Sequence, residues 1–163
     1  PLLQTGKPAI NELEWMQRLY FKAAAEGHFL LPDRGARYKA LVQRNFMSMV
    51  KQGRMVDFEL EAEATIYRKV GKKVGYVVVT DITKIPDGRE IHLFLVDARW
   101  RGQGIGRQMM IQVLDLWHAK SDLYVRYFPP SKAMIHLVES HGFFYDRQNR
   151  DGSGVYILPQ QAN

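Results

Sequence analysis

Three glycines and three arginines lie close together where an apolar segment gives way to a helical pattern. Residues 101 to 106 read Arg-Gly-Gln-Gly-Ile-Gly, and Arg99 and Arg107 flank them. Glycines let consecutive backbone N–H groups approach phosphate oxygens, and the N-terminus of a following helix adds the positive end of its dipole. The segment therefore predicts a site for a cofactor that carries a pyrophosphate.

The spacing of the glycines narrows the choice of cofactor. A Walker loop requires Gly-x-x-x-x-Gly-Lys-Ser/Thr, which no stretch of the chain supplies. A dinucleotide fingerprint requires Gly-x-Gly-x-x-Gly early in a repeating strand-helix-strand unit. Here the pattern is Gly102-x-Gly104-x-Gly106, far along the chain. Neither of these common phosphate-binding loops matches.

The pattern Arg101-x-x-Gly104-x-Gly106 instead resembles the acyl-CoA pyrophosphate loop of the GNAT superfamily of N-acyltransferases. The wider segment 95–106 is similar to that family's core motif almost position by position. A second element, the predicted helix 131–143 that ends in His-Gly-Phe, resembles the family in the right order and separation. The resemblance covers roughly residues 62–158.

The resemblance implies acetyl-CoA as the cosubstrate and no metal. In this family the pantetheine pairs with the strand before the loop, beside a bulge, and backbone donors face the thioester oxygen, which gains negative charge during the reaction. Carried onto this chain, those backbone groups belong to Phe94, Leu95 and Val96. The remaining cofactor contacts would come from Arg101, Gly102, Gln103, Gly104, Ile105, Gly106, Arg107 and Ser131.

The resemblance also implies that an amine attacks the thioester directly. An amine with a pKa of about 10.4 must first lose a proton to a base. The family often has an acidic residue four positions before the residue matched by Val96, and here that position is His92. Because an unperturbed imidazole has a pKa of about 6.5, His92 suits a base. Glu90, on the same strand face by parity, is the alternative, and a satisfied core histidine is the other interpretation of His92.

The chain departs from the family at the general acid. The position that commonly carries a tyrosine is Val138, which has no proton to donate, and Ser131 stands where many members have asparagine. Three explanations remain open: another hydroxyl reaches the sulfur, solvent protonates it, or the enzyme is impaired. The candidate hydroxyls belong to Tyr124, Tyr127, Ser131 and Tyr145. The histidines other than His92 are interpreted as structural, with His28 in a loop and His118, His136 and His141 on or beside helices.

The periodicity along the chain predicts the elements that position these residues. Apolar stripes predict a helix from Leu13 to Ala23 and a second, capped by Asp33, that ends near Gly53. Strands are then predicted from Asp57, over 74–80 after a turn at Gly71, and over 90–96 after a polar loop at 86–88. Ile105, Met109, Val113 and Trp117 form one helix face, followed by a strand at 123–128, a helix at 131–141 and two final strands at 143–145 and 154–158.

This order predicts a mixed α/β fold. Consecutive strands imply antiparallel pairs, and strand-helix-strand implies a parallel crossover. We expect a GNAT-like, mostly antiparallel twisted sheet with helices on both faces and the parallel crossover at the acyl-CoA site. All 163 residues are expected to form one domain, with two N-terminal helices in 9–53 and a cofactor-binding core in 62–158.

Composition limits the function further. The chain has no cysteine, a hydrophobic content of 46% and a net charge of +6. A cysteine nucleophile and cysteine-ligated zinc are thereby excluded, and neither a membrane span nor a signal peptide is visible. A cytoplasmic protein is expected. The positive charge suits a cofactor with several phosphates, or nucleic acid.

We therefore predict an N-acetyltransferase that moves an acetyl group from acetyl-CoA to a primary amine, in a small molecule or peptide, within a ternary complex. The alternatives are a non-catalytic acyl-CoA-binding or regulatory module and a member that acylates charged tRNA. A homodimer is possible, and no membrane partner is expected. Candidates for the acceptor surface are Trp15, Tyr20, Phe29 and Tyr38.

Overall fold

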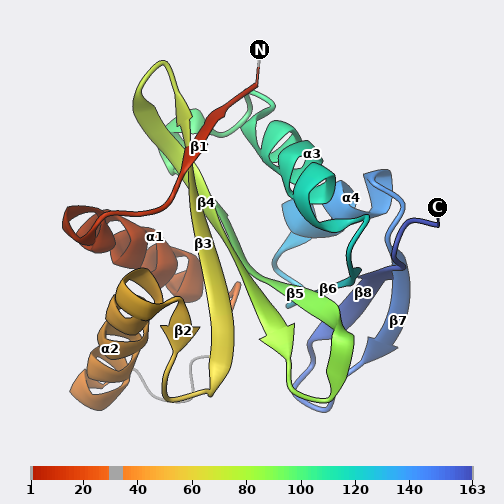
Figure 1. Ribbon diagram of the computed structural model, residues 1–163, viewed down its shortest axis with the longest axis horizontal. Helices are drawn as coiled ribbons and strands as arrows, with labels where there is room; N and C mark the ends of the chain where they lie inside the picture. The colour runs from red at the N-terminus through yellow and green to blue at the C-terminus, as the bar shows by residue number, and fades with distance from the viewer. Residues whose placement is uncertain (1, 30–34, 163) are drawn as a thin grey trace.

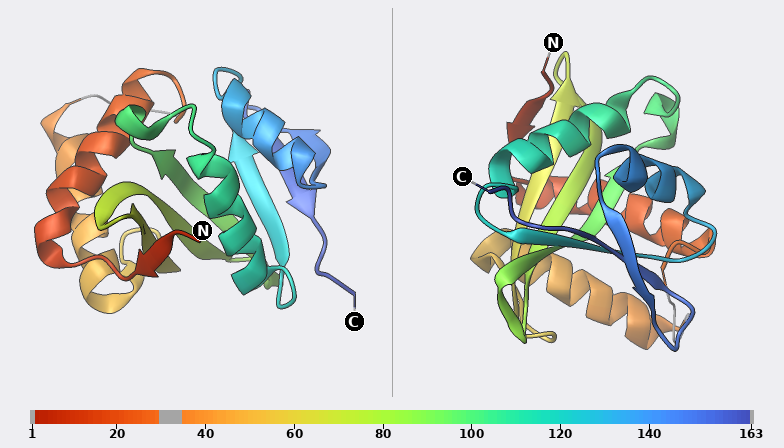
Figure 2. Two further views of the ribbon diagram at one scale, coloured as in Figure 1. Left: turned by 90° about the horizontal axis from the view of Figure 1, so that it is seen from above. Right: turned by 90° about the vertical axis from the view of Figure 1, so that its right-hand side faces the viewer.

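A twisted sheet separates two pairs of helices in the computed structural model, which describes residues 2–29 and 35–162 (Figure 1). Helices α1 and α2 cover one face, and α3 and α4 cover the other (Figure 2). The elements in chain order are β1 (Gln4–Gly6), η1 (Ile10–Glu12), α1 (Leu13–Ala25), α2 (Ala36–Gln52), β2 (Arg54–Met55), β3 (Leu60–Lys69), β4 (Lys72–Ile82), β5 (Ile85–Val96), η2 (Ala98–Trp100), α3 (Ile105–Trp117), β6 (Asp122–Tyr127), α4 (Lys132–Ser140), β7 (Phe144–Gln148) and β8 (Gly154–Leu158).

The strands follow the order β1-β3-β4-β5-β6-β8-β7, and the short β2 pairs with β3 outside this path. Within the described residues every pair is antiparallel except β5 with β6, which is parallel. That parallel pairing is brief, since it joins only residues 88–90 of β5 to residues 122–124 of β6. The mixed, mostly antiparallel sheet with one parallel crossover is the fold class that the sequence predicts.

Successive side chains of β4 point to opposite faces of the sheet and fill the hydrophobic core on each side. Tyr76 and Val78 point to the side of α1 and α2, whereas Val77 and Val79 point to the side of α3 and α4. This is the two-residue period of a strand with a helix layer on each face. Tyr76 is fully buried, and its hydroxyl donates a hydrogen bond of 2.8 Å to the carbonyl of Met16 on α1.

The helices predicted from apolar periodicity are confirmed. α1 buries Met16 and Ala23 from the predicted stripe, and α3 buries Ile105, Met109 and Val113. α2 ends at Gly53, whose left-handed backbone (φ 68°) lets its N–H reach the carbonyl of Met49 at 2.9 Å. The predicted cap Asp33 lies outside the described residues.

Two predicted boundaries are wrong. The strand expected from Asp57 begins at Leu60, because the Asp57 carboxylate accepts hydrogen bonds from Arg44 and Asn45 of α2 and residues 56–59 form turns instead. The polar loop expected at 86–88 belongs to β5, and the chain reverses one step earlier, at residues 83–84. In addition, the sequence did not predict β1, which pairs with residues 66–68 of β3.

Among the helices of residues 2–29 and 35–162, none combines the length and the apolar character that a bilayer crossing requires.

Gly75 on β4 tests how closely β5 and α3 pack against this strand. A Cβ built there would lie 2.4 Å from the carbonyl oxygen of Leu95 and 2.9 Å from the sulfur of Met109. We expect Gly75→Ala to lower the free energy of unfolding by about 1–3 kcal/mol, the usual cost of overpacking, as measured by urea denaturation. Gly6→Ala on β1 is the control, because its new Cβ meets nothing within 4 Å. Equal losses at the two positions would contradict this account.

Candidate functional site

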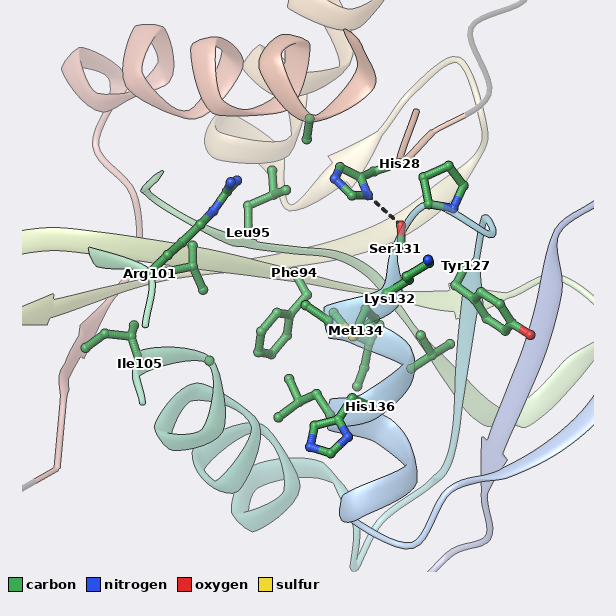
Figure 3. Close-up of a pocket in the computed structure, with 18 of the residues that line it drawn as sticks. His28, Phe94, Leu95, Arg101, Ile105, Tyr127, Ser131, Lys132, Met134 and His136 are labelled. Carbon is green, nitrogen blue, oxygen red and sulfur yellow. Dashed lines mark hydrogen bonds between the residues drawn. The ribbon is translucent and has the colours of Figure 1, made fainter. Parts of the chain in front are cut away.

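A cavity of about 520 Å³ lies between the diverging halves of β5 and β6 (Figure 3). β5 contributes residues 91–96 except Leu93, β6 contributes residues 125–127, and α4 contributes residues 132–134 together with His136 and Leu137. The loop before α3 and residues 28–29 complete the wall. We call this space the first cavity. Because no described strand pairs with β5 beyond Glu90 on the side of β6, an unpaired strand edge faces the first cavity.

Asp97 fixes the start of the glycine loop. Its carboxylate accepts hydrogen bonds from the backbone N–H of Arg99 at 3.1 Å, the Arg99 guanidinium at 3.0 Å and the indole N–H of Trp15 at 3.2 Å. The Arg99 guanidinium, assisted by the other two donors, holds the pKa of Asp97 down at about 2 although burial acts in the opposite direction. The buried carboxylate therefore stays ionised and ties the loop to α1.

The loop itself presents an open backbone. Gly102 and Gly104 have left-handed conformations, with φ of 76° and 77°, and nothing lies within 4 Å of a Cβ built at either one. Gly104 is the N-cap of α3, and its carbonyl accepts the N–H of Gln108 at 3.1 Å. The first N–H groups of α3 have no acceptor within the helix. This concave, donor-rich surface fits a pyrophosphate.

Most of the predicted cofactor residues line the first cavity. Those that do are Phe94, Leu95, Val96, Arg101, Gly102, Gly104, Ile105, Gly106 and Ser131. Gln103 and Arg107 do not. The Gln103 amide lies 3.4 Å from the carbonyl of Arg99, and Gln103 borders a different surface pocket together with Trp15 and Lys73. The Arg107 side chain is exposed to solvent.

His92 occupies a β-bulge. Val78 pairs with Leu93 and Val79 pairs with Ile91, so His92 is the extra residue of β5. Its Nδ1 lies 3.5 Å from a carboxylate oxygen of Glu90, and Arg126 approaches the other oxygen at 3.7 Å. Burial raises the pKa of Glu90, but His92 and Arg126 outweigh burial and leave that pKa below its ordinary value. Glu90 is therefore ionised at neutral pH and serves better as a partner of His92 than as a base.

A second cavity, of about 430 Å³, adjoins the first. Four residues line both: His28, Phe29, His92 and Arg126. Aromatic rings dominate the far wall, and they belong to Tyr20, Tyr38, Phe46, Phe58 and Phe128.

The aromatic wall is internally braced. Tyr20 stacks on Phe29 with ring centroids 5.0 Å apart, and its hydroxyl lies 2.6 Å from that of Tyr38. Burial, together with Tyr38, raises the pKa of Tyr20, so the phenol stays neutral. Three of the predicted acceptor residues thus gather in the second cavity, whereas Trp15 lies elsewhere, beside Asp97.

Sequence reasoning missed one part of the site. His28 was expected to be a structural loop histidine, yet its Nδ1 lies 2.7 Å from the hydroxyl of Ser131 at the start of α4. The two residues are 103 positions apart. Only the fold brings them together, and no local motif signals the pair.

The other histidines keep structural contacts. The Nε2 of His118 lies 2.9 Å from the carbonyl of Pro159, and the Nδ1 of His141 lies 2.9 Å from the carbonyl of Leu137 near the end of α4. His136 is exposed on α4, although it borders the first cavity. Among the described residues, no three histidine or acidic side chains gather into a group that could hold a metal ion.

Comparison with known proteins agrees with this geometry. A family model for the acetyltransferase (GNAT) domain matches residues 55–144. The fold is similar to that of an acetyltransferase from Thermus thermophilus, with a TM-score of 0.72, 16% identity and coverage of 98% of this chain and 97% of that one. No curated protein matches in sequence.

Two further solved structures are similar in fold. The spermidine N-acetyltransferase of Vibrio cholerae, solved with CoA and spermine, gives a TM-score of 0.71 at 15% identity and covers 97% of this chain and 95% of that one. The ribosomal-protein-S18-alanine N-acetyltransferase of Escherichia coli gives a TM-score of 0.67 at 16% identity. That comparison covers 99% of this chain and 96% of the other. Because the family model spans more than half of the sequence, the chain belongs to the GNAT acetyltransferase family.

The depressed pKa of Asp97 predicts a pH-dependent contribution to stability. Since this pKa falls from 3.8 to about 2 on folding, the stabilisation is fully present above pH 3.8 and is lost as the pH falls through about 2. Allowing for water around the exposed Arg99, we expect Asp97→Asn to lower the free energy of unfolding at pH 7 by about 1–2 kcal/mol. Urea denaturation should show the difference from wild type narrowing between pH 4 and pH 2. Asp115→Asn, at an exposed position on α3, should show no such trend.

Proposed function

We propose that the protein is an acyl-CoA-dependent N-acetyltransferase, which transfers an acetyl group from acetyl-CoA to a primary amine by direct attack in a ternary complex. One observation carries the proposal: two cavities meet at His92, and one of them ends at an open, glycine-built anion cradle. Separate, adjoining cavities for an anionic donor and an acceptor suit a reaction in which both are bound together.

Acetyl-CoA suits the first cavity. The backbone of residues 102–106 and the N-terminus of α3 would hold the pyrophosphate, with Arg101 and Lys132 adding positive charge. The unpaired edge of β5 at residues 94–96 would accept the pantetheine in the manner of an added strand. When bound, the cosubstrate supplies an activated acetyl group. The structure of the similar spermidine N-acetyltransferase contains CoA, which supports the same assignment here.

His92 would act as the base. It faces both cavities, and the ionised Glu90 beside its Nδ1 favours the tautomer that leaves Nε2 free to accept a proton. Taking a proton from the ammonium form of the acceptor, directly or through a water molecule, would generate the attacking amine. Arg126 neutralises part of the Glu90 charge and keeps the carboxylate in place.

The second cavity indicates the class of acceptor. Aromatic and aliphatic side chains make up most of its wall, while Glu90 and Asp151 provide the carboxylates. A primary amine with an apolar body would bury that body against the rings and place its nitrogen beside His92 and Glu90. We therefore propose an apolar amine, free or at the end of a peptide, as the acceptor.

Calorimetric titration with acetyl-CoA tests the cofactor assignment. We expect micromolar affinity for acetyl-CoA and free CoA, and no binding of NAD. Gly104→Asp should abolish binding, because it places a negative side chain and a strained left-handed backbone in the anion cradle. Gly71→Asp is the matched control, since Gly71 is also left-handed but forms the β3–β4 turn far from the cavity. Failure of the wild-type protein to bind any CoA species would overturn the assignment.

A kinetic comparison tests the base. Thiol release from acetyl-CoA should rise along a series of primary amines of equal charge and increasing apolar bulk. With the best amine, His92→Gln should reduce kcat by about 10²–10⁴-fold, the usual effect of losing a general base. His118→Gln provides a control at a histidine that lines neither cavity. An unchanged kcat for His92→Gln would rule out this role.

A further inference from the structure

Ser131 occupies the N-cap of α4 without capping the helix. A serine at this position usually accepts a hydrogen bond from an N–H of the first turn, which stabilises a helix by about 1 kcal/mol. Here the side chain makes no such bond. The buried hydroxyl instead lies 2.7 Å from the Nδ1 of His28, inside the first cavity (Figure 3). The Ser131 hydroxyl thus contacts the His28 imidazole in place of the usual helix-capping hydrogen bond.

His28 has a second partner. Its Nε2 lies 3.4 Å from a carboxylate oxygen of Glu26 at the end of α1, and the guanidinium of Arg101 lies 3.9 Å from the same oxygen. Glu26, His28 and Ser131 therefore form a continuous chain from the surface to the first cavity. Because His28 also lines the second cavity, its imidazole lies where the two cavities meet, and it links Ser131 in the first cavity to that junction.

The other hydroxyls considered from the sequence are poorly placed. Tyr124 and Tyr145 line neither cavity, and the Tyr145 side chain is 52% exposed. Tyr127 lines the first cavity, but its hydroxyl points away from His28 and Ser131 (Figure 3), and its ring packs tightly against Gly154 of β8. Val138 is fully buried and carries no hydroxyl.

We infer that Ser131 and His28 form a proton relay that protonates the departing sulfur of the acyl donor, with Glu26 orienting the imidazole. The inference rests on the proposed acetyl transfer and adds the general acid that position 138 lacks. Together with His92 and Glu90, the relay gives the junction of the cavities two histidine–carboxylate pairs, one to remove a proton and one to supply it.

The carbon–sulfur bond breaks and the sulfur keeps the electron pair, while the hydroxyl hydrogen of Ser131 moves to sulfur. Ser131 regains a hydrogen from the Nδ1 of protonated His28, which becomes neutral and keeps its Nε2–H toward Glu26. Solvent that enters the first cavity after the products leave returns a proton to Nδ1. The amine nitrogen loses two protons, one to His92 before it attacks and one to solvent by way of His92 as the tetrahedral intermediate collapses, while the sulfur takes up one proton through the relay. The products are therefore the amide, the free thiol and one net proton for each ammonium consumed.

Charged groups of both signs lie around His28. Glu26 is the one carboxylate in direct contact, and Arg101 partly offsets it. The other titratable or charged groups that share the walls of the two cavities with His28 are Glu90, His92, Arg126, Lys132, His136, Asp151, Tyr20, Tyr38 and Tyr127.

The pH profile of kcat separates the relay from a structural role. Wild type should give a bell, in which His92 must be neutral and His28 protonated. We expect Ser131→Ala and His28→Asn each to reduce kcat by about ten- to a hundredfold. This effect is small for the loss of a general acid, because a thiol with a pKa of about 8.5 is a good leaving group even without protonation. Both variants should lose the limb at high pH and keep the limb at low pH. Asparagine places an amide N–H near the position of Nδ1, so His28→Asn preserves the link to Ser131 but cannot transfer the proton.

Calorimetric titration with CoA provides the folding control, and both variants should still bind CoA. His28→Asn, at a position outside the predicted cofactor contacts, should stay within about twofold of wild type, a shift well below 1 kcal/mol. His118→Gln should leave the profile unchanged. Full kcat with an intact high-pH limb in His28→Asn and Ser131→Ala would overturn the relay and assign the proton to solvent. Absence of thiol release from the wild-type protein with every amine would instead overturn the acetyl transfer on which the relay rests.

Discussion

The site depends on how briefly β5 and β6 pair. Parallel hydrogen bonding joins only residues 88–90 to residues 122–124, and the strands then diverge. Backbone N–H and C=O groups along an unpaired strand need partners, and an edge at the surface would invite another chain. Here the edge lies inside the molecule, between α4 and the glycine loop. The same divergence therefore creates the first cavity and leaves a strand edge within it for a ligand to complete.

The bulge at His92 lets β5 contribute side chains to both hydrophobic cores and also to the cavities. Without an extra residue, Ile91 and Leu93 would face the same side of the sheet. With it, Ile91 packs into the core beneath α3 and Leu93 into the core beneath α1. Both cores are thus filled, and the inserted residue is free to serve a purpose other than packing. A bulge next to a site commonly redirects a side chain in this way, and here it brings an imidazole to the walls of both cavities.

The sequence predicts the parts of the structure that local patterns encode. The glycine loop and the amphipathic helices are of this kind, since spacing alone defines them. The strand boundary at Leu60 is not, because side-chain contacts from Arg44 and Asn45 of the preceding α2 hold Asp57 in a turn despite its alternating neighbours. β1 is likewise not encoded by a local pattern, since its three residues form a strand only by pairing with β3. The contact between His28 and Ser131 depends on the complete fold.

The packing of Val138, at the position where the family resemblance implies a tyrosine, bears on the proposed relay. Val138 packs within the core beneath the sheet and lines neither cavity, so the backbone there directs its side chain inward. Ser131 lies seven residues earlier, which is about two helical turns and therefore on a similar side of α4. At the N-terminus of α4, a hydroxyl also lies where the helix dipole favours a developing negative charge. In the proposed relay, the short side chain of Ser131, in contact with His28, would thus supply the proton that the buried Val138 cannot.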